Sequence, residues 1–206
     1  MEIQERVSLG RFAQFALATS AQRRAMVADH RRLLNTVWSP ITDPYRFLIN
    51  AIVAMHRDGS DASALDSAIT RESSVRRRTV IEDAAADYLG WLTAVNPSGS
   101  FPVASVTWRC GNACVRVNPE LGLEINGTRY VVKLHFVKRS LSRDEAALMT
   151  VSMRAALGSS VPADCKMAVL DVRSGVLHIE PRYQDRVLRR LRAAADDLAE
   201  VWTTTR

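Results

Sequence analysis

Residues 117–136 read VNPELGLEINGTRYVVKLHF, and this stretch decides which fold the chain adopts. Asn126 and Gly127 stand at its centre, and this dipeptide favours a type I′ turn, in which both positions need a positive φ. Apolar and polar residues alternate on either side of the turn, as in a half-buried strand. The pattern predicts a hairpin with an apolar face and a polar face. Its polar face pairs Glu124 with Arg129, Glu120 with Lys133, and Asn118 with His135.

The residues around this hairpin predict a sheet with helices attached to it. VTWRCGNACVRV, residues 106–117, favours an earlier hairpin with its turn at Gly111 and Asn112. Further helices and strands are expected over residues 142–157, 166–172, 176–180 and 182–202. The second half of the chain is therefore expected to run β-β-β-α-β-β-α, with its first three strands as one antiparallel meander.

The first half of the chain has helical periodicity. Apolar residues recur at helical spacing over residues 10–18, 21–37, 44–58, 62–70 and 74–95. NPSGSFP, residues 96–102, then breaks the pattern with two prolines, a glycine and two serines. The fold class predicted is α+β, with a helical region over residues 1–95 and a sheet region over residues 103–206 that ends in a basic helix.

The composition of the chain limits the classes of protein to which it can belong. The chain has 206 residues, of which 47% are hydrophobic and 24% charged, as in an ordinary globular protein. No apolar run reaches the roughly 18 residues that cross a bilayer, so we expect a cytoplasmic protein without a membrane partner. Three cysteines without an export signal predict free thiols. The net charge of +6 lies mainly in residues 96–206, which hold 16 basic and 11 acidic side chains.

A helix that leads into three antiparallel strands, followed by a helix and a strand, resembles the core of the PD-(D/E)XK, or restriction-endonuclease-like, superfamily. The resemblance covers roughly residues 78–180. In that family a Pro-Asp pair opens the second strand and Glu-x-Lys or Asp-x-Lys lies on the third. Two carboxylates there bind Mg²⁺, and the lysine assists the attacking water. The matching positions are Pro119 and Glu120, then Lys133, Leu134 and His135.

These positions depart from the family pattern where the metal binds. Mg²⁺ prefers carboxylate ligands, but Glu120 is expected opposite Lys133, which stands where a second carboxylate is needed. The resemblance therefore implies a degenerate copy, a pseudoenzyme without a metal or another cofactor. We assign no catalytic residue, and Glu120, Lys133 and His135 are only candidates. Three interpretations remain: ordinary ion pairs on a solvated sheet face, a functional polar patch, or an active metal-dependent nuclease that uses Glu120.

The final helix has an unusual distribution of charge. Its first half carries Arg182, Arg186, Arg189, Arg190 and Arg192, and its second half carries Asp196, Asp197 and Glu200. Both groups oppose the helix dipole. Its apolar seam is expected to begin at Tyr183 and end at Trp202.

Two interpretations account for these arginines. One is local pairing of Asp185 with Arg189 and of Arg192 with Asp196. The other is that Arg186, Arg189 and Arg190 contact nucleic-acid phosphates together with Arg76, Arg77 and Arg78. Six such contacts on duplex DNA predict a slope of about −5 in log K against log salt.

The sequence thus predicts a non-catalytic nucleic-acid-binding or regulatory protein. The alternative from another class is an interaction module whose sheet face or helical half binds a protein partner. No P-loop, dinucleotide-binding, nucleophile-elbow or HExxH motif is present. Asp171 is expected to face His178 across the last hairpin, without a nucleophile at a suitable spacing.

Overall fold

The computed structural model describes residues 6–34, 44–59 and 62–205. Its elements follow the order β1 (Arg6–Ser8), α1 (Leu9–Leu17), α2 (Ser20–Leu34), α3 (Arg46–Asp58), α4 (Ser63–Thr70), α5 (Val75–Val95), β2 (Gly99–Phe101), β3 (Val106–Cys110), β4 (Ala113–Val117), β5 (Leu121–Ile125), β6 (Thr128–His135), α6 (Arg143–Leu157), β7 (Lys166–Asp171), β8 (Val176–Ile179) and α7 (Asp185–Thr204). The predicted α+β class, with a helical N-terminal region before the sheet region, is confirmed, and the short strand β1 before α1 was not predicted.

The hairpin of residues 117–136 forms the centre of a five-stranded sheet. The strand order is β2-β5-β6-β7-β8, and only β6 and β7 run parallel. Asn126 and Gly127 both have positive φ, at 50° and 72°. The predicted register is confirmed, because Leu123 lies opposite Tyr130 and Glu124 lies opposite Arg129.

The expected three-stranded meander is wrong. The chain from Val106 to His135 instead forms four strands in two sheets, since β4 belongs to a separate sheet of order β1-β4-β3. The break falls at Asn118–Glu120, between β4 and β5. Pro119 explains it, because proline has no amide to donate to a ladder and also restricts the residue before it.

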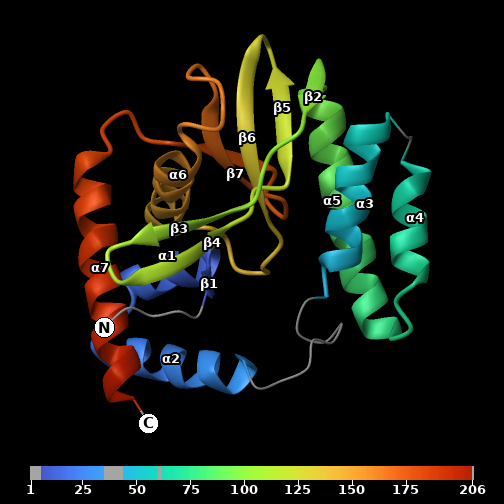
Figure 1. The fold of residues 1–206 in the computed structure, drawn as a ribbon. Helices are drawn as coiled ribbons and strands as arrows, with labels where there is room; N and C mark the ends of the chain where they lie inside the picture. Colours follow the sequence, from blue (N-terminus) through green and yellow to red (C-terminus); the bar gives the residue numbers. More distant parts are fainter. Residues whose placement is uncertain (1–5, 35–43, 60–61, 206) are drawn as a thin grey trace.

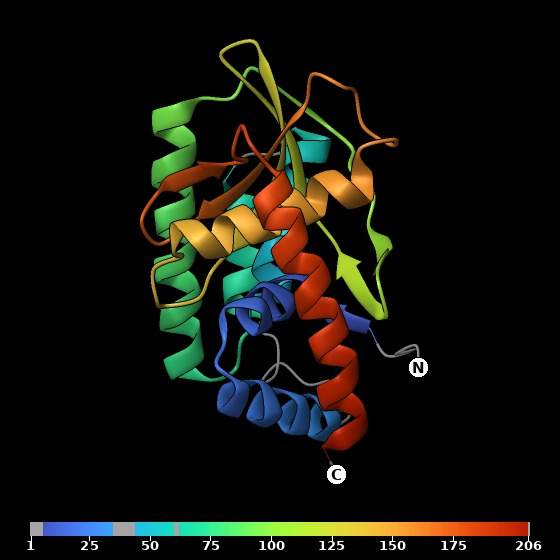
Figure 2. The same ribbon diagram turned by 90° about the vertical axis from the view of Figure 1, so that its left-hand side faces the viewer.

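Helices cover both faces of the five-stranded sheet. Helices α1, α2, α6 and α7 pack around one core, and α3, α4 and α5 pack around the other, on the opposite side of the sheet (Figures 1 and 2). Strand β6 supplies both cores, with Val131 in the first and Val132 in the second. Helices therefore lie over both faces of this sheet. The predicted regions 1–95 and 103–206 share both cores.

Capping residues mark the ends of several helices. The Ser142 hydroxyl accepts a hydrogen bond from the Glu145 amide at 3.2 Å and caps α6. Gly59 ends α3 with a φ of 66°. The helix expected over residues 44–58 begins at Arg46. The three cysteines are free, as predicted, and buried. None of the described helices has the length and apolar character needed to cross a membrane.

Candidate functional site

Glu120 and Lys133 form the predicted cross-strand pair. The Lys133 ammonium contacts Oε1 of Glu120 and also donates to the Asn118 carbonyl oxygen at 3.2 Å. The second carboxylate oxygen, Oε2, accepts from the Leu134 amide at 2.7 Å. Both oxygens of Glu120 are therefore already bound by donors from the protein itself.

This pair is buried, so the expectation of a solvated sheet face is wrong for it. The side chains of Glu120 and Lys133 are only 6% and 15% exposed. Burial raises the pKa of the Glu120 carboxyl, and the Lys133 ammonium and the Leu134 amide oppose that rise. A charge in such a place needs a partner. Residues of α3 and of the segment after β2 line a hollow beside Glu120.

The expected partner of Glu124 also differs. Arg129 lies opposite Glu124 in the register but makes its ion pair with Asp164, at 2.7 Å. Glu124 accepts a hydrogen bond from the Ser98 hydroxyl at 3.2 Å instead. Register alone therefore did not decide which charges pair, because a third segment supplied a competing carboxylate.

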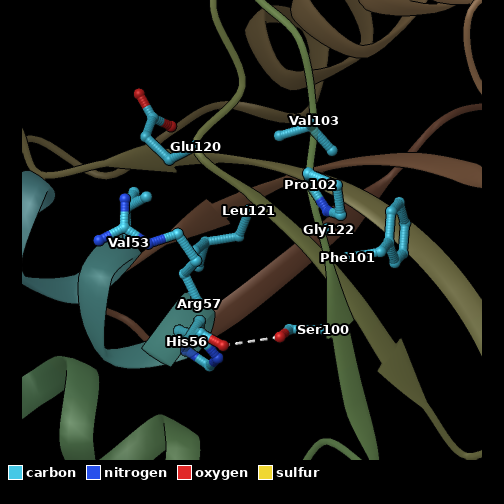
Figure 3. Close-up of a pocket in the computed structure, with 10 residues that line it drawn as sticks. All are labelled: Val53, His56, Arg57, Ser100, Phe101, Pro102, Val103, Glu120, Leu121 and Gly122. Carbon is cyan, nitrogen blue, oxygen red and sulfur yellow. Dashed lines mark hydrogen bonds between the residues drawn. The ribbon is translucent and has the colours of Figure 1, made fainter. Parts of the chain in front are cut away.

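A hollow lies where β2 leaves the edge of β5, and Glu120 lines one end of it (Figure 3). His56 and Ser100 line the other end, and the Glu120 carboxylate points away from them in Figure 3. The His56 ring shares a 2.6 Å hydrogen bond with the Tyr88 hydroxyl, and the Ser100 hydroxyl donates to the His56 backbone oxygen at 2.7 Å. These groups do not form a nucleophile and base pair, which requires the hydroxyl to contact the imidazole ring.

His135 lies apart from that hollow, in a buried polar cluster at the ends of β6 and β7. It is 8% exposed and lies opposite Asp171, which is 1% exposed and accepts from the Leu141 amide at 3.1 Å. Burial lowers the pKa of His135, while the carboxylates of Glu145 and Asp171 favour its protonated form. The expectation that Asp171 faces His178 is wrong, since His178 lies opposite Val169.

The cluster around His135 also fixes the loop between β6 and α6. Glu145 is buried in the first turn of α6 and forms a bidentate pair with Arg139, with both distances at 2.7 Å. Across the described ranges, no group of three or more His, Cys, Asp and Glu side chains is arranged to hold a metal ion. The carboxylates of Glu145 and Asp171 thus accept hydrogen bonds from donors within the protein.

The six predicted phosphate-binding arginines fall into two separate groups. Arg76, Arg77 and Arg78 begin α5, which packs on one side of the five-stranded sheet, and Arg186, Arg189 and Arg190 begin α7, which packs on the other. In Figure 1 these two helix starts lie at opposite corners of the molecule. One nucleic-acid strand held by all six at once is therefore not supported.

The group on α5 is partly occupied within the protein. Arg77 pairs with Glu72 at 2.8 Å, and Arg78 donates two hydrogen bonds to the Glu72 backbone oxygen at 3.0 and 2.9 Å. Only Arg76 of this group is exposed. Arg77 and Arg78 therefore fix the start of their own helix.

The group on α7 is exposed instead. Arg186, Arg189 and Arg190 all lie on the surface, and the only hydrogen bond in which the described residues engage them runs from Arg190 to the Ala16 carbonyl oxygen, at 3.3 Å. The predicted local pairs, Asp185 with Arg189 and Arg192 with Asp196, do not come within ion-pair distance in the part of the chain described. Local pairing thus fails to explain these arginines.

Tyr183 is a surface residue that the sequence interpretation missed. It was expected to begin the apolar seam of the final helix, but its side chain is 81% exposed. Helix α7 begins at Asp185, so the helical period does not extend back to Tyr183. Arg182 lies beside it, with its guanidinium carbon 5.7 Å from the centroid of the Tyr183 ring. The sequence signal for this exposed residue was an aromatic side chain directly before a basic helix. Its helical spacing from the apolar seam concealed that signal.

No family model matches this chain, and no curated protein is significantly similar to it.

Proposed function

We propose that this protein binds nucleic acid without cleaving it, through a surface at the start of α7. This surface, called the α7 basic surface below, consists of Arg182, Arg186, Arg189 and Arg190. The observation that carries the proposal is that these guanidinium groups are exposed and, among the described residues, have no carboxylate partner.

Helix energetics support this interpretation. Cations near a helix N-terminus oppose the dipole, so they lower stability by roughly 0.3–1 kcal/mol each unless an anion compensates them. Among the described residues no carboxylate lies within ion-pair distance of Arg186, which stands beside Asp185 in the first turn of α7. A phosphate provides the compensating charge and suits the planar guanidinium group.

The Glu120 site supports binding without cleavage. Metal-dependent cleavage needs carboxylate oxygens that are free to coordinate a cation. The two oxygens of Glu120 are engaged by Lys133 and by the Leu134 amide, and His135 lies in a different cluster with Asp171. This geometry favours the pseudoenzyme interpretation of the resemblance to PD-(D/E)XK nucleases.

Binding can be measured by fluorescence anisotropy with a labelled duplex of random sequence over a range of salt concentrations. We expect affinity to fall as salt rises, with a slope of about −2.7 if three phosphates are contacted. A variant with Arg186→Ala, Arg189→Ala and Arg190→Ala should lose most of this binding and most of the slope. An unchanged affinity would remove the α7 basic surface from consideration.

A charge-matched control is available elsewhere on the molecule. Arg6, Arg24 and Arg116 are exposed and lie on β1, α2 and β4. Their combined replacement by alanine removes the same charge, and it should leave most of the affinity in place. Equal loss in both triple variants would indicate that net charge alone, and no particular surface, attracts the duplex. Incubation with Mg²⁺ or Mn²⁺ tests cleavage directly, and cut duplex would contradict the non-catalytic proposal.

A further inference from the structure

Tyr183 stands out from the other large hydrophobic side chains by its exposure. Its exposed fraction of 81% exceeds that of Val75, at 75%, and those of the β8 residues Val176 and Ile179, at 47% and 45%. An aromatic ring of this size normally contributes to a core or an interface. Here it lies next to four arginines of the α7 basic surface in the sequence.

The backbone on both sides of Tyr183 is held in place. Before it, Glu180 accepts hydrogen bonds from the Met167 amide at 3.0 Å and from Arg154. After it, the Gln184 side-chain amide donates to the same Glu180 carboxylate at 2.9 Å. The short segment that carries Tyr183 is thus anchored to β7 and α6 through Glu180, and Gln184 is joined to the same carboxylate.

The surroundings of the ring are basic. The Arg182 guanidinium lies over the ring at 5.7 Å, and this contact leaves the opposite ring face for another planar group. Arg186 and Arg190 are one helical turn apart, about 6 Å along the axis, and line a hollow between α6 and α7. Asp144 lines the same hollow and Asp185 precedes Arg186, so the arginines still outnumber the acids.

We propose that Tyr183 stacks against an unpaired base of a single-stranded nucleic acid while the α7 arginines contact its phosphates. This inference rests on the proposed function and narrows it to a ligand class. Any base offers a flat face to an aromatic ring, so such stacking tolerates many sequences. The bases of a duplex are already stacked on each other, and their faces are not accessible to Tyr183.

The test compares three labelled ligands of equal length: a single strand of mixed sequence, the same strand with abasic sites throughout, and the duplex. Wild-type protein should bind the single strand more tightly than the abasic strand, which keeps the phosphates but lacks the bases. Tyr183→Ala should weaken binding of the single strand about 5- to 100-fold. The same variant should bind the abasic strand and the duplex as the wild type does.

Tyr183→Phe is the matched variant, because it keeps the ring and removes only the hydroxyl. Like the wild type, this variant should bind the single strand more tightly than the abasic strand. Since Tyr183 is exposed, neither substitution should unfold the protein, and circular dichroism checks this. Equal affinity of the wild type and Tyr183→Ala for the single strand would overturn the stacking proposal.

The arginine variant separates this failure from failure of the proposed function. If Arg186→Ala, Arg189→Ala and Arg190→Ala together abolish binding while Tyr183→Ala has no effect, the protein binds phosphates through α7 and the stacking proposal falls alone. If the wild type binds none of the three ligands at low salt, both proposals fall.

Discussion

The two ends of α7 carry charges that oppose the helix dipole, but the protein treats them differently. At the C-terminal end, Asp197 pairs with Arg23 of α2, and the backbone oxygens of Trp202 and Thr205 accept hydrogen bonds from Arg31 of the same helix. Figure 2 shows α2 next to this end of α7. At the N-terminal end no described carboxylate pairs with Arg186 or Arg189.

This difference separates charges that maintain the fold from charges that are available to a ligand. Arg31 also lies 5.2 Å from the centroid of the Trp202 ring, so it joins α2 to α7 by packing as well as by hydrogen bonds. Arg186 and Arg189 have no such role in the described structure. A charge with partners inside the protein should therefore affect stability when it is removed, and one without partners should affect binding.

The largest effect on stability is expected from Lys133, the least exposed of the basic side chains that form ion pairs among the described residues. Lys133→Met leaves the buried Glu120 carboxylate without its cation, which should lower the free energy of unfolding by about 3–5 kcal/mol at pH 7. The pKa of Glu120 is already raised by burial, so the folded variant should take up a proton as the pH falls and recover part of the loss. Urea denaturation at pH 5 and pH 7 measures this.

A double variant serves as the control for Lys133. Glu120→Gln combined with Lys133→Met removes both charges and keeps an acceptor for the Leu134 amide, so it should be more stable than Lys133→Met at pH 7. If Lys133→Met equals the wild type at pH 7, the pair does not have the structural role assigned to it.

The next largest effect is expected at the C-terminal end of α7. Arg31→Ala removes the donors to two backbone oxygens and the contact with Trp202, which should cost about 1–3 kcal/mol. Binding to nucleic acid should change little. Arg24→Ala, an exposed neighbour on the same helix, should alter stability by less than about 0.5 kcal/mol. Equal stability of the two variants in thermal unfolding would contradict the comparison.

Replacing Arg186 at the N-terminal end of α7 should raise the stability of the protein, whereas replacing Arg31 at the other end should lower it. Arg186→Glu replaces a cation in the first turn of α7 with an anion, so it should raise the free energy of unfolding by about 0.5–1 kcal/mol. The same variant should lose affinity for nucleic acid. Arg186→Gln removes only the cation and should give a smaller gain. A loss of stability in Arg186→Glu would show that Arg186 has a structural partner after all.

A further effect on stability is expected when the pH falls. Burial lowers the pKa of His56 and of His135, so the unfolded chain binds more protons than the folded protein as the pH falls below about 6.5. Stability should therefore decrease from pH 7 toward pH 5, by at most about 1.4 kcal/mol per pH unit for each histidine. His135→Gln should reduce this slope in urea titrations. A slope identical to that of the wild type would exclude His135 as a contributor.

Several parts of the fold could be read from local signals. Asn126 and Gly127 defined the central hairpin and its register, Ser142 and Gly59 marked helix ends, and the Glu120 and Lys133 pair followed from the register. Each depends on residues that are neighbours in the chain or directly opposite across a short turn. For such features the side-chain period and the turn chemistry are sufficient.

Other features depend on segments far apart in the chain. The parallel pairing of β6 with β7 brought His135 next to Asp171, and a helical crossover separates these strands. The partners of Asp197 and Arg129 came from α2 and from the loop before β7. No local pattern identifies such partners, because oppositely charged groups at many positions have similar intrinsic affinity.

The sequence by itself determined the helices, the central hairpin and the unfavourable order of charges along the final helix. Only the tertiary structure decided which charges are satisfied and which remain exposed, because burial and ion pairing depend on which distant segments pack together. The packing of α2 against the C-terminal end of α7 gave partners to that end alone, and it left the arginines at the other end on the surface.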